Sequence, residues 1–451
     1  MKLLLFSTVV TILSCLLPSP LQAQNPPLTL RQAIDRALEA NPQAAIARAN
    51  ENDAVAAAAQ SRTQLLPQLN FTEDISRGND PVYVFGERLR QRQFTQNDFA
   101  LNALNRPQPI GDFSTRFSGS WLAFDSFHTE REIRRADLYR RSATASGAAA
   151  SQQIVLRVVA AYQQALYAQR EVDVAEHEEQ TAEALLAQAA VHVQAGLAVE
   201  SDRMAAQVNL AARKEESIAA HGDLDMAWAD LREAMGVPDQ QTTELQPIEA
   251  RDFPASSLTD ELAMAMKMRS DLAAMVQAQQ AQQESVAAAR SDFGPRISAY
   301  GNWEEDRGSI TGAGGNNWMA GVQIGIDILP IGKRQQLARE TAAKQRADAQ
   351  LAQQRSQVRL DVNRAHIQRE TALLSLATAQ AAMDQAAESL RIFKNRYAAG
   401  LATIADLLRA EDAERESQSN YWHSVYGSAM AYAQLLYAEG ILTPDAAEGL
   451  Q

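Results

Sequence analysis

The sequence predicts a mainly α fold with membrane β-strands, a trimeric α/β barrel in which each chain gives four strands to a twelve-stranded barrel. Three observations predict this fold. One is a heptad pattern that runs from residue 351 to residue 397, and another is a weaker copy of it 204 residues earlier. The third is a set of segments in which apolar and polar residues alternate. Helices, strands and duplication together indicate thin helical walls joined to a membrane sheet.

The heptad pattern lies between Leu351 and Tyr397, where apolar residues recur at alternating steps of four and three. This spacing keeps one narrow helix face against neighbouring helices over many turns. Only Arg355 and Arg369 interrupt the seam. We expect one continuous helix over residues 332–399, about 100 Å long at 1.5 Å per residue.

A tight reversal follows this helix at residues 397–407. Gly400 can adopt the left-handed conformation that ends a helix. Thr403 and Asp406 then suit the first turn of a returning helix, because their oxygens accept from free backbone N–H groups and an acid favours the positive helix end. The pattern therefore predicts a helical hairpin.

The copy of this hairpin appears when 204 is subtracted from each seam position, so that Ile154, Val158 and Ala165 fall on a second seam. The reversal at 196–202 matches residues 400–406 at four of seven positions, within a tip of about residues 193–203. The same register holds without a gap from Ile154 to Gly236. We conclude that the chain is a duplication, with repeats at 24–242 and 243–451.

The chain begins with a targeting segment. Lys2 precedes an apolar run from Leu3 to Leu17, and a cleavage-like sequence ends at Ala23. This predicts a secretory signal peptide over residues 1–23. Cys15 leaves lipid attachment open as the alternative, although the three residues before it fit a lipobox poorly.

Composition narrows the function classes. The formal net charge is −13, and removal of Lys2 makes it −14 in the mature chain, which argues against nucleic acid as a partner. No mature segment approaches 18 consecutive apolar residues, so we expect no transmembrane helix. The six histidines form no metal-ligand spacing, and neither a nucleophile–base set nor a phosphate loop is visible. We therefore expect neither an enzyme nor a cofactor.

Each repeat also contains a shorter helical region, at 28–66 and 258–292, and the first of these breaks at Pro42. The pattern pairs Leu28 with Leu258, and Thr29 with Thr259. A proline follows each region, and the period then changes from helical to two. A β-hairpin is expected after each one.

The two β-hairpins are expected at about 69–123 and 296–328. The clearest strand alternates from Trp318 to Ile328, with polar or small residues between its apolar ones. Such strands have one face for lipid and one for water. The first hairpin has a long loop at about 77–112, and the second a short, glycine-rich loop at about 306–316.

Four strands cannot close a barrel, and open sheet edges cannot face lipid. The chain must therefore oligomerise. Three copies would supply twelve strands, a number that leaves room for a channel.

The order of elements, the reversal at 400–410 and its copy at 196–202 resemble the TolC family of outer-membrane efflux proteins. The resemblance covers essentially the whole mature chain. It implies a homotrimer in the outer membrane of a Gram-negative bacterium, with a periplasmic tunnel of coiled-coil helices. It further implies a passive exit duct of a tripartite efflux or type I secretion system. Its partners would be a periplasmic adaptor, an inner-membrane transporter and outer-membrane lipid.

The resemblance also implies a periplasmic gate. Asp202 and Tyr397 resemble the pair that latches neighbouring hairpins closed, and Asp406 resembles a member of the acidic ring at the constriction. Two positions depart from the family pattern. This chain has Ala402 where some relatives have a latch arginine, and Arg409 where some have a second ring aspartate. Arg409 would then be free to pair with Asp406. For both aspartates the alternative role is to complement a helix dipole.

The helical reversals would form the tips on which the adaptor docks, at Gly196, Leu197, Gly400 and Leu401. One alternative function stays open, a periplasmic coiled-coil adaptor or tether without a pore. The sequence does not separate drugs, metals and secreted proteins as cargo, because such a duct conducts what its transporter delivers.

Overall fold

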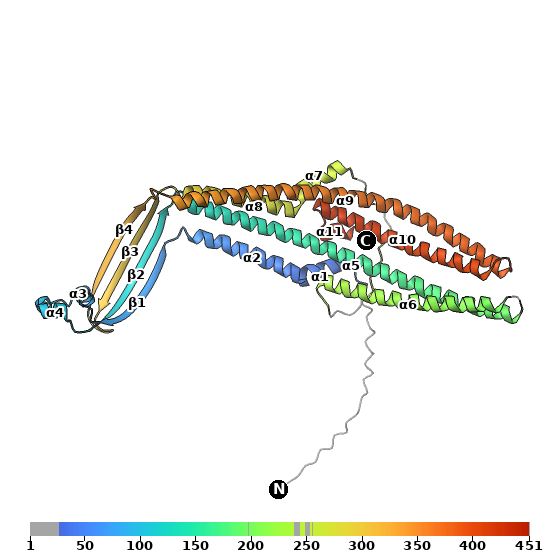
Figure 1. Cartoon of the computed structure of the whole chain (residues 1–451), viewed down its shortest axis with the longest axis horizontal. Coiled ribbons are helices and arrows are strands. Elements are labelled where there is room, and N and C mark those ends of the chain that lie inside the picture. The colour runs from blue at the N-terminus through green and yellow to red at the C-terminus, as the bar shows by residue number, and fades with distance from the viewer. Residues whose placement is uncertain (1–26, 197, 239–243, 249–252, 255, 451) are drawn as a thin grey trace, which may run out of the picture.

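The computed structural model describes residues 27–196, 198–238, 244–248, 253–254 and 256–450. The expected signal peptide, Cys15 and Leu197 lie outside these residues. The chain is elongated, with a β-sheet at one end and two helical hairpins that reverse at the other (Figure 1). Within the described residues, none of the helices combines the length and hydrophobicity needed to cross a membrane.

The sheet has four antiparallel strands in chain order. They are β1 (Gln68–Gly78), β2 (Ile110–Phe124), β3 (Arg296–Arg307) and β4 (Gly314–Gly325). β1 and β4 are the two edges, so each chain offers two unpaired strand edges to its neighbours.

The strand register separates the two faces of the sheet. On one face, Phe71, Phe117, Trp303 and Trp318 are directly paired and form an aromatic row across all four strands. The Phe71 and Phe117 ring centroids lie 5.1 Å apart. Trp318 is 79% exposed in the single chain, as a lipid-facing residue would be. The opposite face carries polar residues such as Ser114.

One expected strand boundary is wrong. β4 ends at Gly325, which pairs with Arg296, whereas the alternating pattern runs on to Ile328. Arg296 is the first residue of β3, and Pro295 precedes it. Within this chain, residues after Gly325 therefore have no β3 residue with which to pair, whatever their alternation.

Two long helical hairpins form the rest of the length. The first is α5 (His128–Gln194) with α6 (Glu200–Met235), and the second is α9 (Ile331–Ala398) with α10 (Ile404–Glu439). The first and last residues of α6 and α10 differ by 204 positions, the offset found in the sequence. α9 has 68 residues and spans about 100 Å.

The shorter helices flank the hairpins. They are α1 (Leu30–Ala40), α2 (Pro42–Thr63), α7 (Leu258–Met268) and α8 (Ser270–Ser291). The boundaries of α7 and α8 follow those of α1 and α2 at one constant offset, by which Leu258 corresponds to Leu30. The expected pairing of Leu258 with Leu28 is therefore wrong by two positions. The N-caps Thr29 and Ser257 fix the true register, whereas the alanine-rich sequence permits several similar ones.

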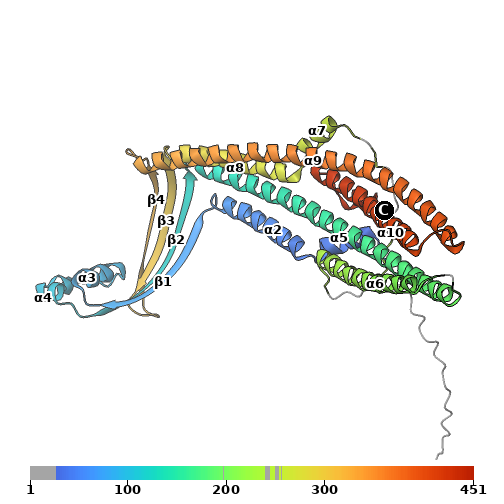
Figure 2. The ribbon, with the colours of Figure 1, turned by 45° about the vertical axis from the view of Figure 1, so that its right-hand side comes forward.

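The expected long loop at 77–112 contains structure that the sequence pattern did not predict. It holds α3 (Pro81–Arg90), a 3₁₀ helix η1 (Gln96–Phe99) and α4 (Leu101–Asn105). Figure 2 shows these elements at the end of the sheet farthest from the long helices. A last short helix, α11 (Pro444–Glu448), lies beside the hairpins (Figure 1).

The main core lies where α1, α5 and the C-terminal ends of α6 and α10 meet, and Leu30, Tyr162 and Leu231 are fully buried there. Gly236 and Gly440 end α6 and α10 with positive φ angles of 72° and 79°. A Cβ on Gly440 would lie 2.8 Å from the Arg269 Cα. The two repeats thus use the same contact, in which the glycine sits against the break between two short helices.

Candidate functional site

The two hairpin tips lie together at the end of the molecule farthest from the sheet (Figure 1). Gly196 and Gly400 both have φ of 71°, as expected for helix-ending glycines. At the second tip, the Leu401 N–H donates to the Arg396 carbonyl at 2.8 Å, which closes the helix end in a Schellman motif. The turn therefore holds Leu401 outside the helical wall.

Exposed apolar side chains mark these tips. Leu401 is 69% exposed, and Val199, at the start of the returning helix of the first tip, is 62% exposed. The expected docking residue Leu197 lies outside the described residues. The tips are otherwise held to each other by a small core, whose buried residues are Leu185, Ala189, Ala206, Leu390, Tyr397, Ile404, Leu407 and Ala410.

Asp406 caps the returning helix. The Thr403 hydroxyl accepts from the Asp406 N–H at 3.2 Å, and the Asp406 carboxylate accepts from the Thr403 N–H and hydroxyl at 3.2 and 2.7 Å. These hydrogen bonds to Thr403 lower the pKa of Asp406. Arg409 Nη1 lies 3.5 Å from Asp406 Oδ1, as the sequence predicted. The capping role is therefore present in a single chain, whereas the acidic ring stays a prediction.

Tyr397 is buried between the tips, with 8% of its surface exposed. Burial and the Asp202 carboxylate raise its pKa. Among the described residues its hydroxyl has no hydrogen-bond partner, so the expected latch bond with Asp202 is not formed in this structure. The latch stays a prediction.

Buried carboxylates that the sequence analysis missed lie just above the tips. Glu178 on α5 and Glu411 and Glu414 on α10 are all buried. Burial raises the pKa of Glu411 to about 7, with Lys394 opposing the shift and Glu178 adding to it. A heptad reading continued through Ile404 and Leu407 would have placed both α10 acids in the seam.

Glu411 predicts a pH-dependent packing of the two hairpins. Its folded pKa lies above the ordinary value of 4.5, so the folded state binds more protons between pH 4.5 and about 7. The stability that protonated Glu411 contributes is fully present below that window. It is lost as the pH rises through the window to about 7, where the buried carboxyl ionises. Glu411→Gln should therefore stabilise the protein near pH 8, by at most about 3 kcal/mol.

The measurement is the thermal midpoint of helix loss at about pH 5.5 and about pH 8. The variant keeps the charged residues that act on Glu411, which are Lys394, Arg213, Asp412 and Glu178. Glu416→Gln, a change at an exposed position of the same helix, is the control. Equal midpoints for Glu411→Gln and wild type at both values would contradict the prediction.

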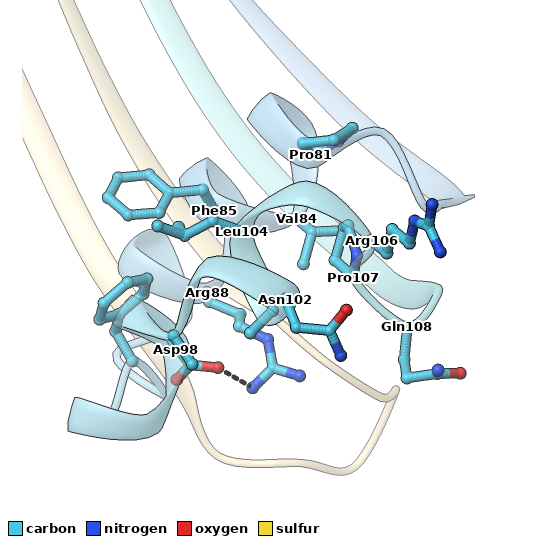
Figure 3. Close-up of a pocket in the computed structure, with 13 residues that line it drawn as sticks. Pro81, Val84, Phe85, Arg88, Asp98, Asn102, Leu104, Arg106, Pro107 and Gln108 are labelled. Carbon is cyan, nitrogen blue, oxygen red and sulfur yellow. Dashed lines mark ion pairs between the residues drawn. The ribbon is translucent and has the colours of Figure 1, made fainter.

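The opposite end of the chain holds a cavity of about 310 Å³ inside the first loop (Figure 3). Arg88 and Asp98 lie across it as an ion pair 3.1 Å apart. Phe94 packs edge-on against Phe85 and Phe99, at 4.8 and 5.2 Å. These contacts join α3 to η1 within one loop, and we assign the cavity to the loop's own packing.

A sheet with two open edges and an exposed aromatic row, joined to long helical hairpins, is the architecture of an outer-membrane channel subunit. The sequence profile of the family described as outer membrane efflux protein matches residues 33–237 and 262–439. The chain belongs to this family. The two matched segments fall in the two repeats.

Similar proteins agree with this assignment. The outer membrane protein TolC of Vibrio cholerae is 25% identical over 431 residues, which cover 92% of this chain and 91% of that protein. The alkaline protease secretion protein AprF of Pseudomonas aeruginosa is 21% identical, covering 85% and 78%. The CmeC outer membrane channel of Campylobacter jejuni superposes with a TM-score of 0.78 at 18% identity, covering 91% of this chain and 85% of that one.

The protein is therefore a trimeric outer-membrane channel of an efflux or type I secretion system, with a membrane barrel and a periplasmic helical tunnel. The alternative of an adaptor or tether without a pore finds no support in these relatives. Members of the family are channels rather than enzymes.

Proposed function

We propose that the chain is the passive exit duct for cargo handed over at its hairpin tips by an inner-membrane transporter and its periplasmic adaptor. One observation carries the proposal. Two reversals that are equivalent in the two repeats lie at one end of the molecule and hold apolar side chains in solvent. Exposed apolar residues that gather at one end of a molecule, as Val199 and Leu401 do, favour a partner that covers them.

The adaptor-docking surface would consist of Gly196, Leu197, Gly400 and Leu401. The glycines set the turn, and the leucines supply the apolar contact. The outward aromatic row would contact outer-membrane lipid, and the acidic net charge makes nucleic acid an unsuitable partner. Relatives named for efflux and for protease secretion leave both cargo classes open for this chain.

Photo-crosslinking in cells tests the docking surface. A photoreactive amino acid at Leu401 should give a defined adduct with a periplasmic protein. The same amino acid at Val82, which is 81% exposed in the loop at the opposite end, should not. No adduct from Leu401, or the same adduct from both positions, would contradict docking at the tips.

The gate would consist of Asp202, Tyr397, Asp406 and Arg409. Three copies of Asp406 around a threefold axis would favour cations in the channel, as acidic rings do in cation channels. Arg409, which already pairs with Asp406, would reduce this preference. We therefore expect weak cation selectivity.

Asp406→Asn should lower the cation-to-anion permeability ratio, and Arg409→Ala should raise it. Asparagine keeps an oxygen that can cap the helix, so this change removes charge with little effect on the turn. Reversal potentials across a salt gradient, measured with the purified trimer in planar bilayers, report the ratio. An unchanged potential in Asp406→Asn would restrict Asp406 to its capping role.

A further inference from the structure

The helix α3 lies at the end of the sheet away from the long helices (Figure 2). It contacts Ser76 and so lies on the polar face, because Ser76 pairs with Asp112 across the strands. The Tyr83 and Ser76 hydroxyl oxygens are 2.8 Å apart, which joins α3 to β1. Gly315 of β4 lies so close to the end of α3 that a Cβ there would be 1.9 Å from the Arg90 carbonyl oxygen. The helix is thus seated on strands from both repeats.

Three acidic side chains meet beneath this helix. Glu87 comes from α3, Asp112 from β2 and Asp306 from β3, and one carboxylate oxygen of each lies within 4.8 Å of the others. Asp306 is completely buried, Asp112 is 3% exposed, and the Glu87 side chain is 12% exposed. Segments far apart in the chain therefore converge on one point.

Several carboxylate oxygens at this point lack hydrogen-bond partners. Neither carboxylate oxygen of Asp306 has a hydrogen-bond partner, and neither does Glu87 Oε2. The hydroxyl of Ser114, the cross-strand neighbour of Asp306, lies close to the Asp306 carboxylate but donates to Glu304 at 3.0 Å. Asp112 receives one hydrogen bond, from Gln91 Nε2 at 2.9 Å. A fully buried carboxylate without a partner is costly unless something neutralises it.

The basic residues nearby supply that charge only in part, because Arg90 pairs with Glu87 but with neither aspartate. Arg90 lies 3.5 Å from Glu87 and 3.8 Å from Glu304, and Arg116 binds Glu304 as well. Among the described residues, neither Asp112 nor Asp306 forms an ion pair. Burial raises the pKa of Glu87, and the Asp112 and Asp306 carboxylates raise it further. A positive charge bound between the three carboxylates would remove this mutual repulsion.

The donor set indicates which cation fits. All three ligands are carboxylate oxygens, which suit hard cations such as Ca²⁺ rather than zinc or copper. Two oxygens on opposite sides of a Ca²⁺ ion, each about 2.4 Å from it, are about 4.8 Å apart. The three oxygens lie within this distance of one another, so they are close enough to share one such ion.

We propose that Glu87, Asp112 and Asp306 bind one divalent cation of calcium size, which fixes α3 to the channel-lining face of the sheet. The ion joins the first loop to β2 and to β3 of the second repeat. It acts as a clamp that holds a helix across the mouth of the barrel.

The test uses the full trimer in detergent, stripped with a chelator and dialysed free of metal. Equilibrium dialysis with radioactive Ca²⁺ should show one ion per chain, and Asp306→Asn should weaken binding about tenfold or more. Glu305→Gln is the matched control, because this neighbouring acid lies on the opposite face of the same strand. It should bind as wild type does.

A second measurement follows the position of α3. Trypsin cleavage after Arg88 and Arg90 should slow several-fold when Ca²⁺ is added to wild type, and should not respond in Asp306→Asn. A smaller effect of Mg²⁺ would support the assigned size. Absence of Ca²⁺ binding in wild type, equal binding by Asp306→Asn, or cleavage that responds to pH and not to Ca²⁺ would each overturn the proposal.

Discussion

Gly440→Ala is expected to leave little folded trimer, since it should reduce the free energy of unfolding by about 2–5 kcal/mol. Gly440 has φ of 79°, a left-handed conformation that a side chain disfavours by about 1–2 kcal/mol. The new Cβ would also lie 2.8 Å from the Arg269 backbone, so α10 would have to move away from the break between α7 and α8. Overpacking of this kind costs about 1–3 kcal/mol more.

Gly400→Ala separates these two costs. Gly400 has φ of 71°, yet a Cβ there would meet no atom within 4 Å. Only the conformational cost of about 1–2 kcal/mol should appear, and trimer should still assemble. Trimer yield and the temperature at which the trimer dissociates on a gel report both variants. Equal losses in the two would show that the packing of Gly440 against Arg269 contributes nothing.

Replacement of Leu197 and Leu401 together by aspartate is expected to abolish export while the trimer remains intact. Leu401 is 69% exposed and belongs to no core, so folding should tolerate the change. An apolar docking contact should not tolerate the change, because each aspartate would bring a charge into a desolvated interface. Cargo accumulation in cells and gel analysis of the purified trimer measure the two effects.

The control for this pair is Val82→Asp, a change at another exposed apolar position, in the loop at the other end of the chain. It should leave export unchanged. Export at the wild-type level in the double tip variant would remove the tips from the docking surface. Loss of trimer in that variant would instead show that the leucines serve folding.

The long elements could be predicted because their patterns repeat over many turns. The helix expected at 332–399 is α9, Ile331–Ala398, since a heptad seam this long leaves little freedom of register. The sheet strands could also be predicted, because apolar and polar residues alternate along them. The offset between the short helices of the two repeats could not be predicted, since a run of alanines looks the same when it is shifted by two residues.

The sites were harder to predict, for two physical reasons. Asp406 is a helix cap in one chain, and any role in a ring depends on contacts between chains. Glu411 occupies a seam position where a charged residue masks the apolar pattern. The carboxylates of Glu87, Asp112 and Asp306 converge only because α3 folds back onto the sheet, and that ten-residue helix carries Gly86 in its middle.

The packing of α9 has a mechanical consequence. Its buried residues cluster at Leu351–Arg369 and again at Leu390 and Tyr397, with partly covered positions between. The span from Ala365 to Ala398 is a lever arm of about 50 Å. A tilt of about 5° at the inner cluster would swing the tip by roughly 4 Å, more than the diameter of a water molecule. Small changes of packing in the middle of the molecule are therefore magnified at the hairpin tips. Variants in the middle should alter conductance although they lie far from the tips.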